Sequence, residues 1–593
     1  MSKSTTLGSS ILSMPDRDPN HIAIKFKVRD EWKEKKWQDY YHDIETVAAG
    51  LLALGIKPGD RIAIMANTRY EWSVSDLAIF GIKAVTVAVY QNNTAEDVEY
   101  ILNNSGARIL ISETRGPLKI FEAVRKECPL IEKLIVFDET CPNPEAITWN
   151  QLQKIGAEYL KAHPTQFREL CSSITPDDFA TLLYTSGTTG RPKGVVMTHR
   201  QAYSEVSEAF PYAGANPKDT SLSFLPYAHI LGRIEHWGHL YIGFTMAYAE
   251  SIEKVRGNLA DVRPTIMVAV PRIFEKIYAA ILAQIQTQPL KQKLFSWALD
   301  IGRKVGEHKM SGQALPLDLL LQYEIARKLV LRKITDAFGG RLRFAISGGA
   351  PIPKEIAIFF HSAGILILEG YGLTETTAAI TVNVPYNYRF GSVGRPIGDV
   401  QLKIADDGEI LVKSDKVMKE YYKNPEATKE VFTDGWFHTG DIGEILPSGD
   451  LKITDRKKDL IKTAGGKYVA PQRLEGLLKL SPYVSHVHVH GDQKKYIVAL
   501  ITLDRPSVAN LAKERGVPYE DWNNLVASSF VQDLIRKVVA DTNSQLASFE
   551  SIKKYLVLPH EFTVESGELT PSLKVKRKVL DQKFKAQIDE LYQ

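Results

Sequence analysis

A stretch rich in hydroxyl groups and glycine, YTSGTTGRPKG at residues 184–194, has the side chains of a loop that holds a phosphate chain. Hydroxyl and backbone N–H groups donate to phosphate oxygens, glycine permits their close approach, and lysine adds positive charge. The common phosphate loop G-x-x-x-x-G-K-[ST] does not match, because Pro192 stands where the second glycine would follow Gly187. The candidate phosphate contacts are Thr185, Ser186, Gly187, Thr188, Thr189 and Lys193.

Two further loops of this kind follow apolar segments, RLRFAISGGAP at 341–351 and GILILEGYGLTETT at 364–377. Each reads as a short buried strand that runs into a loop rich in glycine or threonine. Ligands of open α/β sheets bind at the carboxyl ends of the strands. We therefore expect the three loops to converge on one ligand.

Three histidines at alternate positions, His486, His488 and His490, would share one face of a strand. Such a face could hold a metal ion, but no cysteine or carboxylate stands at a matching spacing. We interpret it as a solvated strand face.

The elements around these residues indicate an α/β protein. Residues 61–113 alternate as strand, helix, strand, helix and strand, which is crossover architecture. Residues 278–335 are amphipathic and basic and predict helix. After residue 455 the pattern becomes α+β, with a hairpin in which DQKK joins two strands. We predict a large N-terminal domain of sheet and helix layers, residues 1–455, and a small α+β C-terminal domain, residues 456–593.

Composition narrows the class of protein. The 593 residues carry 74 Lys+Arg against 70 Asp+Glu, and a net charge of +4 over this length gives no case for nucleic-acid binding. Three cysteines without metal-type spacing suit a reducing cytoplasm. No apolar stretch reaches the roughly 18 residues of a membrane span. We expect a cytoplasmic protein and leave peripheral contact with the inner face of a membrane open.

Four segments, YTSGTTGRPKG, YGLTETT, WFHTGDIG and DRKKDLIKTAGGKYVAP, resemble in this order the motifs of the adenylate-forming (AMP-binding) superfamily. The resemblance runs from about Arg61 to Arg577. LPYAHILGR (225–233), the basic helical region and LTPSLKVKR (569–577) are most similar to long-chain fatty acyl-CoA synthetases. The resemblance implies two steps. A carboxylate attacks the α-phosphate of ATP to give acyl-AMP and pyrophosphate, and the coenzyme A thiol then displaces AMP.

The resemblance also implies roles for individual residues. The 184–194 loop would hold the β- and γ-phosphates, Thr188 and Glu375 would bind Mg²⁺, and Lys574 would neutralise charge during adenylation. Asp441 and Arg456 would contact the ribose. The adenine would lie among Gly348, Gly349, Ala350, Pro351, Glu369, Gly370, Tyr371, Gly372 and Thr374, where the Tyr371 ring offers a stacking face.

The small domain is expected to rotate between the steps. Lys458 would be its hinge, and Gly465 and Gly466 would lie in the loop that meets coenzyme A. His229 would lie near the acyl channel, although a packed core histidine is an equal alternative. His236, Trp237 and His239 are assigned to the core or the channel wall without a choice between them. Solvated basic runs are the alternatives for Lys574 and Lys458.

The sequence as a whole predicts an ATP-dependent long-chain fatty acid–CoA ligase that uses ATP, Mg²⁺ and coenzyme A. Two rival functions stay open. One is an acyl-AMP ligase that passes the acyl group to a carrier protein. The other is a non-catalytic protein that binds nucleotide or an anionic surface, which the presence of Thr188, Glu375, Asp441, Arg456 and Lys574 disfavours.

Overall fold

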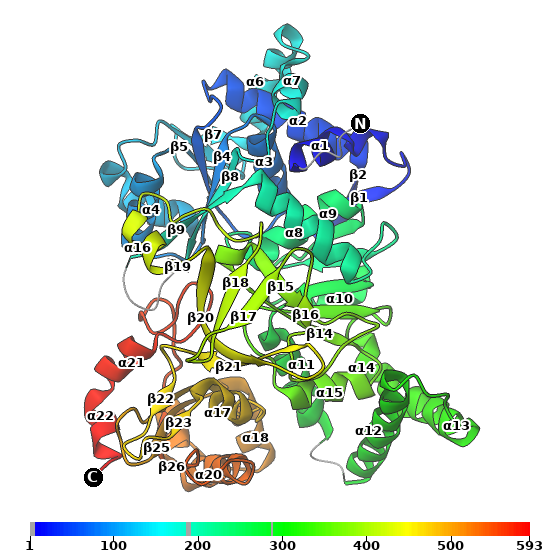
Figure 1. Ribbon diagram of the computed structural model, residues 1–593, viewed down its shortest axis with the longest axis vertical. Helices are drawn as coiled ribbons and strands as arrows, with labels where there is room; N and C mark the ends of the chain where they lie inside the picture. The colour runs from blue at the N-terminus through cyan, green and yellow to red at the C-terminus, as the bar shows by residue number, and fades with distance from the viewer. Residues whose placement is uncertain (1–5, 115, 186–190, 286–288) are drawn as a thin grey trace.

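The computed structural model describes residues 6–114, 116–185, 191–285 and 289–593. A seven-stranded sheet forms its first layer, in the order β7-β6-β5-β3-β4-β8-β9 (Figure 1). Neighbouring strands are parallel except β8 and β9, which are antiparallel. The bounds are β3 (Arg61–Met65), β4 (Val85–Val89), β5 (Ala107–Ser112), β6 (Lys133–Val136), β7 (Ile147–Thr148), β8 (Phe179–Thr185) and β9 (Lys193–Thr198).

The alternation expected at residues 61–113 is confirmed, with α3 (Tyr70–Gly81) and α4 (Ala95–Ser105) between the strands. Helix α4 begins where the Thr94 hydroxyl accepts a hydrogen bond of 3.2 Å from the Asp97 N–H, as N-cap threonines do. It ends at Gly106, whose φ of 69° is left-handed and costs glycine little. Local capping signals therefore fix both ends of this helix.

The large body contains two further sheets, in the orders β10-β11-β1-β2 and β12-β13-β14-β15-β16. In the second sheet β12, β13 and β14 are parallel, so the loops after β13 and β14 leave the same edge, as expected. The bounds are β1 (Ile22–Val28), β2 (Glu31–Lys36), β10 (Thr220–Ser223), β11 (Thr245–Tyr248), β12 (Ile266–Ala269), β13 (Phe344–Ser347), β14 (Ile367–Leu373), β15 (Ala378–Val382) and β16 (Arg395–Pro396).

A fourth, antiparallel sheet connects the large body to the small one. It contains β17 (Gln401–Ile404), β18 (Glu409–Lys413), β19 (Phe432–Thr433), β20 (Trp436–Ile445) and β21 (Leu451–Arg456). Its pairing places Asp441 of β20 directly opposite Arg456 of β21. Two residues that are fifteen positions apart in sequence therefore face one another across neighbouring strands.

The C-terminal region has its own hydrophobic core, made of residues between 461 and 588 (orange and red in Figure 1). The predicted hairpin is confirmed by the antiparallel pair β24 and β25, and β26 lies parallel to β25. The bounds are β22 (Ile461–Lys462), β23 (Tyr468–Val469), β24 (Val484–His490), β25 (Ile497–Leu503), β26 (Ile552–Leu558), α17 (Pro471–Leu478), α18 (Arg505–Glu514), α20 (Ser529–Asn543), α21 (Arg577–Lys583) and α22 (Lys585–Glu590).

The helical structure expected at 278–335 is confirmed, but the chain folds back on itself there. Helices α12 (Pro289–Met310) and α13 (Leu317–Ala326) are separated by a turn that contains Gly312, whose φ is 66°. α11 (Pro271–Ile285) precedes them, and a π-helical turn η3 (Arg327–Leu331) and α14 (Arg332–Asp336) follow. Within the described part of the chain, no helix has the length and apolar character needed to cross a bilayer.

Candidate functional site

Lys574 lies in a tight loop of the small body that reaches the large body. The Lys574 N–H donates to the Thr570 hydroxyl at 3.0 Å, and the Thr570 N–H donates to the Lys574 carbonyl at 2.8 Å. At the tip of this loop, the Asn92 amide donates to the Pro571 carbonyl at 3.2 Å. These bonds fix the lysine backbone against both bodies.

The Lys574 ammonium lies near charged groups from outside its own loop. Its side chain is accessible to water, but protein lies around it, and this partial burial together with Arg456 lowers its pKa to about 8. Asp441 and Glu375 are close enough to oppose the shift. An ammonium and two carboxylates that are far apart in sequence therefore lie near one another.

Asp441 is held on two sides. The Tyr371 hydroxyl donates to its Oδ2 at 2.7 Å, and Arg456 Nε lies 3.3 Å from its Oδ1. Burial raises the pKa of the Asp441 carboxyl, although Arg456 and Tyr371 oppose that shift. The hydroxyl contact of Tyr371 is additional to the stacking role predicted for its ring, which stays a prediction.

Glu375 follows β14 in a 3-10 turn, η4 (Thr374–Thr376). Its Oε1 accepts a hydrogen bond of 2.8 Å from the Tyr421 hydroxyl, and its carbonyl accepts one of 2.6 Å from the Met418 N–H. Lys193 Nζ lies 5.0 Å from the centre of the Tyr421 ring. Tyr421 thus connects the phosphate-loop lysine with the candidate magnesium ligand.

Tyr421 was missed in the sequence analysis. Its role depends on the pairing of its segment with β9, where the Tyr422 N–H donates to the Gly194 carbonyl at 2.7 Å. The signal that could have found it is the aromatic pair in EYYKNPEAT, which directly precedes an Asn-Pro helix start.

A buried ion pair supports the Glu375 turn from behind. Glu205 and Lys416 are both fully buried, with Nζ 3.3 Å from the Glu205 carboxylate. Glu205 also accepts the Ala379 N–H at 3.0 Å, and the Lys416 carbonyl accepts the Thr377 hydroxyl at 2.7 Å. The segment that follows Glu375 is therefore held by two residues, Glu205 and Lys416, that are distant from it in sequence.

The loop after β13 is tightly constrained. Gly348 is buried, whereas Gly349, Ala350 and Pro351 are exposed, and Gly349 has a φ of 79° that favours glycine. In β14, a Cβ at Gly372 would lie 1.4 Å from the Ala378 carbonyl oxygen, so only glycine fits.

His229 lies at the start of α9 (Ile230–Ile242), beside this loop. Its Nδ1 accepts the Leu231 N–H at 3.1 Å, which leaves the ring proton on Nε2. Burial and the nearby Lys574 lower its pKa to about 3, so the ring is neutral at physiological pH. Its Cε1 is 3.9 Å from the position of a Cβ at Gly349. The nearness of His229 to this loop and to Lys574 argues against the packed-core alternative, and its place near an acyl channel stays a prediction.

The neighbours of His229 on α9 belong to the core. Trp237, His236 and His239 are fully buried. The Trp237 indole donates to Asp76 at 3.1 Å, and His239 Nε2 lies 3.1 Å from the Ala23 carbonyl. Helix α9 therefore presents its first turn to the site and buries the rest.

Glu369, which we expected to contact the nucleotide, is a neutral carboxylic acid and not a carboxylate at neutral pH. Burial raises the pKa of its carboxyl to about 8, against hydrogen bonds from the backbones of Gly391 and Ile352. The carboxyl is therefore protonated at neutral pH, and it connects the loop after β13 to the segment around Gly391.

The predicted hinge and coenzyme A loop are exposed. Lys458 lies in a turn after β21, where the Asp459 N–H donates to the Arg456 carbonyl at 3.0 Å. Gly465 and Gly466 lie between β22 and β23, and Gly466 has a φ of 74° with open space around it. Lys458, Gly465 and Gly466 are therefore all accessible from solvent.

Part of the phosphate loop lies outside the described residues, namely Ser186, Gly187, Thr188 and Thr189. Its two ends are described. Thr185 of β8 pairs with Lys193 of β9, and the Thr185 hydroxyl donates to the Lys193 carbonyl at 3.4 Å.

The three alternate histidines do not form a solvated face. Asp581 of α21 supplies the carboxylate that sequence spacing did not show, and its Oδ1 lies 2.8 Å from His488 Nε2 and from His490 Nδ1. The ligand atoms of the three residues lie within 4.8 Å of one another, a spacing that could hold a metal ion. His486 is apart from them, and burial lowers its pKa to about 3.

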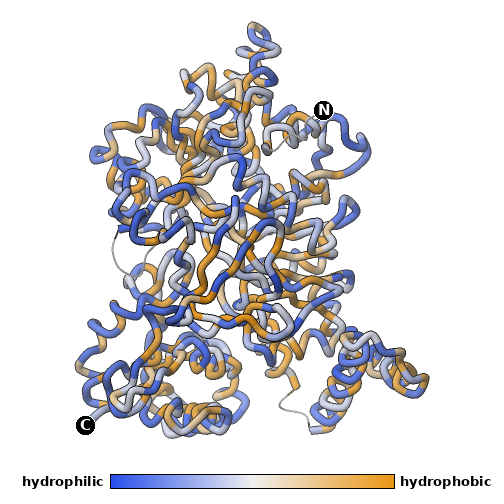
Figure 2. Tube along the Cα trace, viewed as in Figure 1, coloured by the Kyte–Doolittle hydropathy of each residue, from blue (hydrophilic) through white to orange (hydrophobic). Residues whose placement is uncertain are grey.

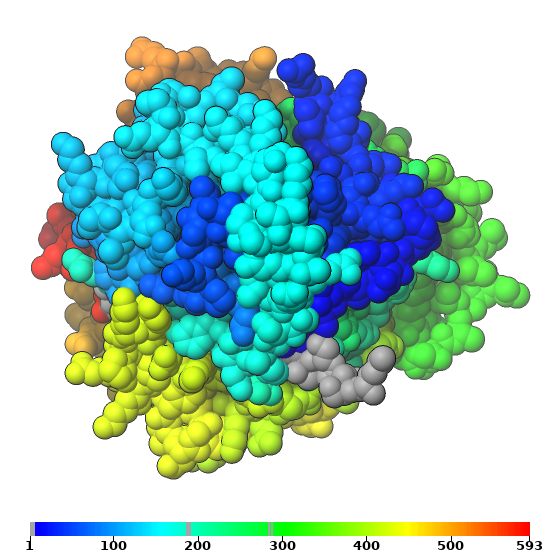
Figure 3. All heavy atoms as spheres, turned by 90° about the horizontal axis from the view of Figure 1, so that it is seen from above, coloured from blue at the N-terminus to red at the C-terminus, as the bar shows by residue number. Residues whose placement is uncertain are grey.

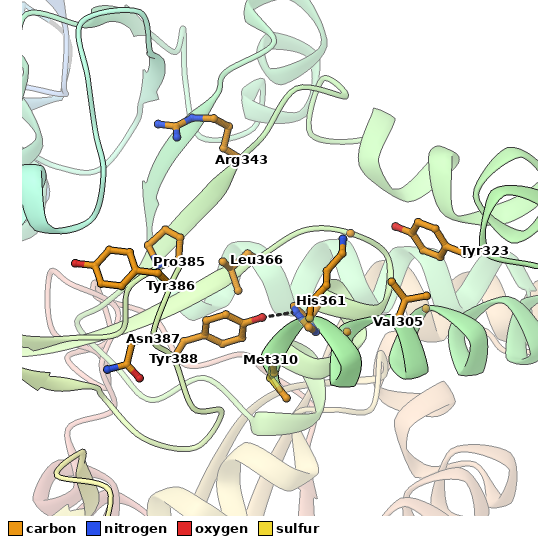
Figure 4. Close-up of a pocket in the computed structure, with 14 residues that line it drawn as sticks. Val305, Met310, Tyr323, Arg343, His361, Leu366, Pro385, Tyr386, Asn387 and Tyr388 are labelled. Carbon is orange, nitrogen blue, oxygen red and sulfur yellow. Dashed lines mark hydrogen bonds between the residues drawn. The ribbon is translucent and has the colours of Figure 1, made fainter. Parts of the chain in front are cut away.

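A cavity of about 380 Å³ lies elsewhere, between α12, α13 and the segment 385–388 (Figure 4). Its wall includes Met310, Tyr323 and the hydrogen-bonded pair His361 and Tyr388, whose Nε2 and hydroxyl are 2.8 Å apart. It shares no lining residue with the group around Lys574, so we do not assign the chemistry to it.

The chain matches two protein-family models, which together span most of its length. The AMP-binding enzyme family matches residues 14–422, and the AMP-binding enzyme C-terminal domain matches residues 458–593. Long-chain-fatty-acid--CoA ligase FadD15 of Mycobacterium tuberculosis is 36% identical over 589 residues, which cover 97% of this chain and 95% of that protein. Long-chain-fatty-acid--CoA ligase 1 of Cavia porcellus is 32% identical over 581 residues, 92% of this chain and 81% of that protein.

Solved structures agree with the fold. The adenylation domain of a carboxylate reductase from Mycobacterium chelonae superposes with a TM-score of 0.78 at 24% identity, covering 100% of this chain and 91% of that chain. The anthranilate CoA ligase AuaEII, in complex with anthranoyl-AMP, gives a TM-score of 0.74 at 21% identity over 98% of each chain.

Proposed function

The chain belongs to the AMP-binding enzyme family, and from this premise we propose that it is an ATP-dependent long-chain fatty acid–CoA ligase. The observation that carries the proposal is the position of Lys574, a residue of the small body, beside Asp441, Glu375 and His229 of the large body and Arg456 at the boundary between the two. The names of relatives at 31–36% identity support the fatty acid as substrate.

In the first step, a carboxylate oxygen of the fatty acid forms a bond to the α-phosphorus of ATP, and the bond to the pyrophosphate oxygen breaks. Two anions must approach, so preplaced cations and donors lower the barrier. Lys574 holds its charge between the two anions, and Lys193 stabilises the departing phosphates. The neutral His229 offers an Nε2–H donor that does not depend on pH in the physiological range.

Glu375 and Thr188 are the residues that we propose for Mg²⁺, which would neutralise phosphate charge. The Glu375 carboxylate fits this role, because among the described residues Tyr421 donates to its Oε1 and no hydrogen bond is made to its Oε2. Asp441 would accept hydrogen bonds from the ribose hydroxyls, with Arg456 beside it. The backbones of residues 348–351 and 370–374 would surround the adenine.

In the second step, the thiol of coenzyme A attacks the acyl carbon and AMP leaves. We propose that the small body, residues 456–593, rotates about Lys458 for this step and brings Gly465 and Gly466 to the site. The cytoplasm remains our proposed location, with fatty acid, ATP and coenzyme A as the small-molecule partners.

The test is pyrophosphate release with purified protein, palmitate and ATP, with and without coenzyme A. We expect release that depends on the acid and turns over fully only with coenzyme A, giving palmitoyl-CoA. Stalled palmitoyl-AMP that coenzyme A does not consume would favour transfer to a carrier protein. Release no faster with palmitate than without would contradict catalysis, and higher rates with acetate or benzoate would contradict the long-chain assignment.

A further inference from the structure

The helical hairpin made of α12, α13 and η3, residues 289–331, exposes an unusual amount of apolar surface. Among the described residues, seventeen large hydrophobic side chains are exposed, and eight of them lie on this hairpin. Leu317 is 84% exposed and Leu290 81%, so these side chains are almost entirely in water. Clusters of this kind on a globular protein mark an interaction site. The eight residues are Leu290, Leu294, Met310, Leu317, Leu320, Leu321, Ile325 and Leu329.

The exposed residues of α13 lie along one stripe. Leu317, Leu321 and Ile325 follow at intervals of four, which places them on one side of the helix. The π-helical turn of η3 then needs more residues per turn, which keeps Leu329 on the same side. Leu319 and Ala326 are buried on the other side. The stripe therefore faces away from the protein.

The hairpin is also positively charged. Residues 289–331 contain seven Lys and Arg but only four Asp and Glu, and Arg332 and Lys333 follow directly in α14. In the part of the chain that the structure describes, Lys291, Lys293, Lys328 and Lys333 have no carboxylate within salt-bridge distance, and Lys328 directly precedes Leu329. Cations beside an exposed apolar stripe are the composition of helices that lie in the surface of an anionic membrane.

The hairpin projects from the large body, and the base of α12 packs closely against that body. Figures 1 and 3, from two directions, show it extending at one side, and Figure 2 shows apolar and polar residues mixed along it. At its base, α12 packs on α15 (Lys354–Ser362), where a Cβ at Gly302 would lie 1.9 Å from the Ser362 carbonyl oxygen. The base is fixed by close helix contact, while the stripe is left uncovered by the chain.

We propose that the 289–331 hairpin docks this protein on the surface of a membrane that contains anionic lipids. Leu317, Leu321, Ile325 and Leu329 enter the boundary between headgroups and acyl chains, and the neighbouring lysines contact lipid phosphates. A second copy of the chain is the less suitable occupant, because a symmetric contact would bring two positively charged hairpins together. The argument depends on the exposed surface alone and is independent of the proposed catalytic function.

Flotation with vesicles tests the proposal. The full chain is mixed with vesicles of phosphatidylcholine alone or with 30% phosphatidylglycerol, and the bound fraction gives a partition coefficient. The test variants are Leu317→Ser/Leu321→Ser/Ile325→Ser and Lys328→Glu/Lys333→Glu. Leu130→Ser/Ile252→Ser is the matched control, because both residues are exposed hydrophobics outside the hairpin.

We expect the wild type to bind the anionic vesicles at least tenfold more strongly than the neutral ones. Each hairpin variant should lose at least tenfold in partition coefficient, while the control keeps its binding and all variants keep the wild-type melting temperature. Absence of wild-type binding, or equal binding by the triple-serine variant, would overturn the proposal. So would a dimer in sedimentation analysis that the triple-serine variant dissociates while vesicle binding stays unchanged.

Discussion

At the scale of single residues, Lys574 combines two properties that a lysine rarely has together. Its side chain is accessible to water, yet partial burial and Arg456 lower its pKa to about 8, while its loop is fixed by Thr570. Such perturbed groups collect at functional sites. Its role should therefore show in the step that brings two anions together and in the pH dependence of that step.

Lys574→Ala should slow acyl-AMP formation by roughly 10²–10³-fold, the usual cost of removing one charge-stabilising group. Thioester formation from preformed acyl-AMP and coenzyme A should be nearly unchanged, because the charge is needed only while the carboxylate approaches phosphate. The two half-reactions are measured separately. An equal loss in both would contradict the assignment, and Lys576→Ala is the control for the general loss of one cation nearby.

The pH profile offers an independent check on Lys574. Its lowered pKa means that the charged form is present below about pH 8 and is lost as the pH rises through that value. We expect kcat/KM for adenylation, which reports the free enzyme, to fall above pH 8. The limb in kcat should lie at higher pH, because bound ATP favours the ammonium. In Lys574→Arg, whose guanidinium stays charged, persistence of the kcat/KM limb would assign it to another group.

Glu375 and Tyr421 should affect magnesium dependence together. Glu375→Gln removes the charge that we assign to the ion, and Tyr421→Phe removes the hydroxyl that orients the carboxylate. Loss of such an orienting partner typically costs about 10–100-fold in metal affinity. We expect a higher Mg²⁺ concentration for half-maximal adenylation in both variants but not in the control Tyr422→Phe. An unchanged Mg²⁺ titration in Glu375→Gln would show that this carboxylate is not near the ion.

At the scale of elements, the sequence predicted what depends on local signals. The strands β3, β4 and β5 are short apolar runs, and Thr94 and Gly106 mark the ends of the helix between two of them. Contacts between segments that are distant in sequence could not be predicted from such local signals. The resemblance to a family predicted that Lys574 and Asp441 act together, whereas spacing alone did not.

Tyr421 and Asp581 show why the rest could not be predicted. Tyr421 acts through the pairing of its segment with β9, and Asp581 reaches His488 from a helix 93 residues further along. Neither partner has a fixed offset in sequence. The break between α12 and α13 was missed because helical periodicity continues on both sides of the turn at Gly312.

Asp581 connects helix α21, which directly follows the Lys574 loop, to strand β24. Asp581→Asn should destabilise the small body by about 1–2 kcal/mol, because hydrogen bonds to a charged group are lost beside the buried His488. The two imidazoles hold the pKa of Asp581 well below its usual value, so its contribution is present above the usual aspartate pKa and is lost as the pH falls through the lowered one.

Thermal melting of the wild type and Asp581→Asn at pH 7 measures this difference. Asp589→Asn on α22 is the control, because this half-buried carboxylate pairs with Lys494 and not with the histidines. Zn²⁺ is added in a second series. A rise in melting temperature with Zn²⁺ in the wild type but not in Asp581→Asn would show that the three residues hold a metal. Equal melting temperatures without metal would contradict the structural role.

At the scale of the whole molecule, two bodies with separate cores meet at the site. Lys458 lies between them in an exposed turn, and among the described residues its N–H donates to no carbonyl or side chain. Proline there would remove no hydrogen bond but would fix φ near −65°. Rotation about this residue needs that angle to change.

Lys458→Pro should therefore hold the enzyme in one arrangement. We expect adenylation to survive, because Lys574 is already at the site, while thioester formation from acyl-AMP falls at least tenfold. Lys458→Ala is the matched control and should be mild in both steps, since the backbone and not the charge is responsible. Equal damage to both steps together with a lowered melting temperature would point to misfolding and contradict the hinge.

The loop that carries Lys574 would also affect the reverse of the first step. By microscopic reversibility, the cation that helps pyrophosphate to leave also helps pyrophosphate to attack acyl-AMP and regenerate ATP. If the small body rotates as we propose to admit the thiol, it would withdraw that cation from the intermediate. Acyl-AMP would then react with pyrophosphate more slowly than with the thiol, so less of the intermediate would return to ATP. The overall equilibrium would stay fixed by the free energies of substrates and products.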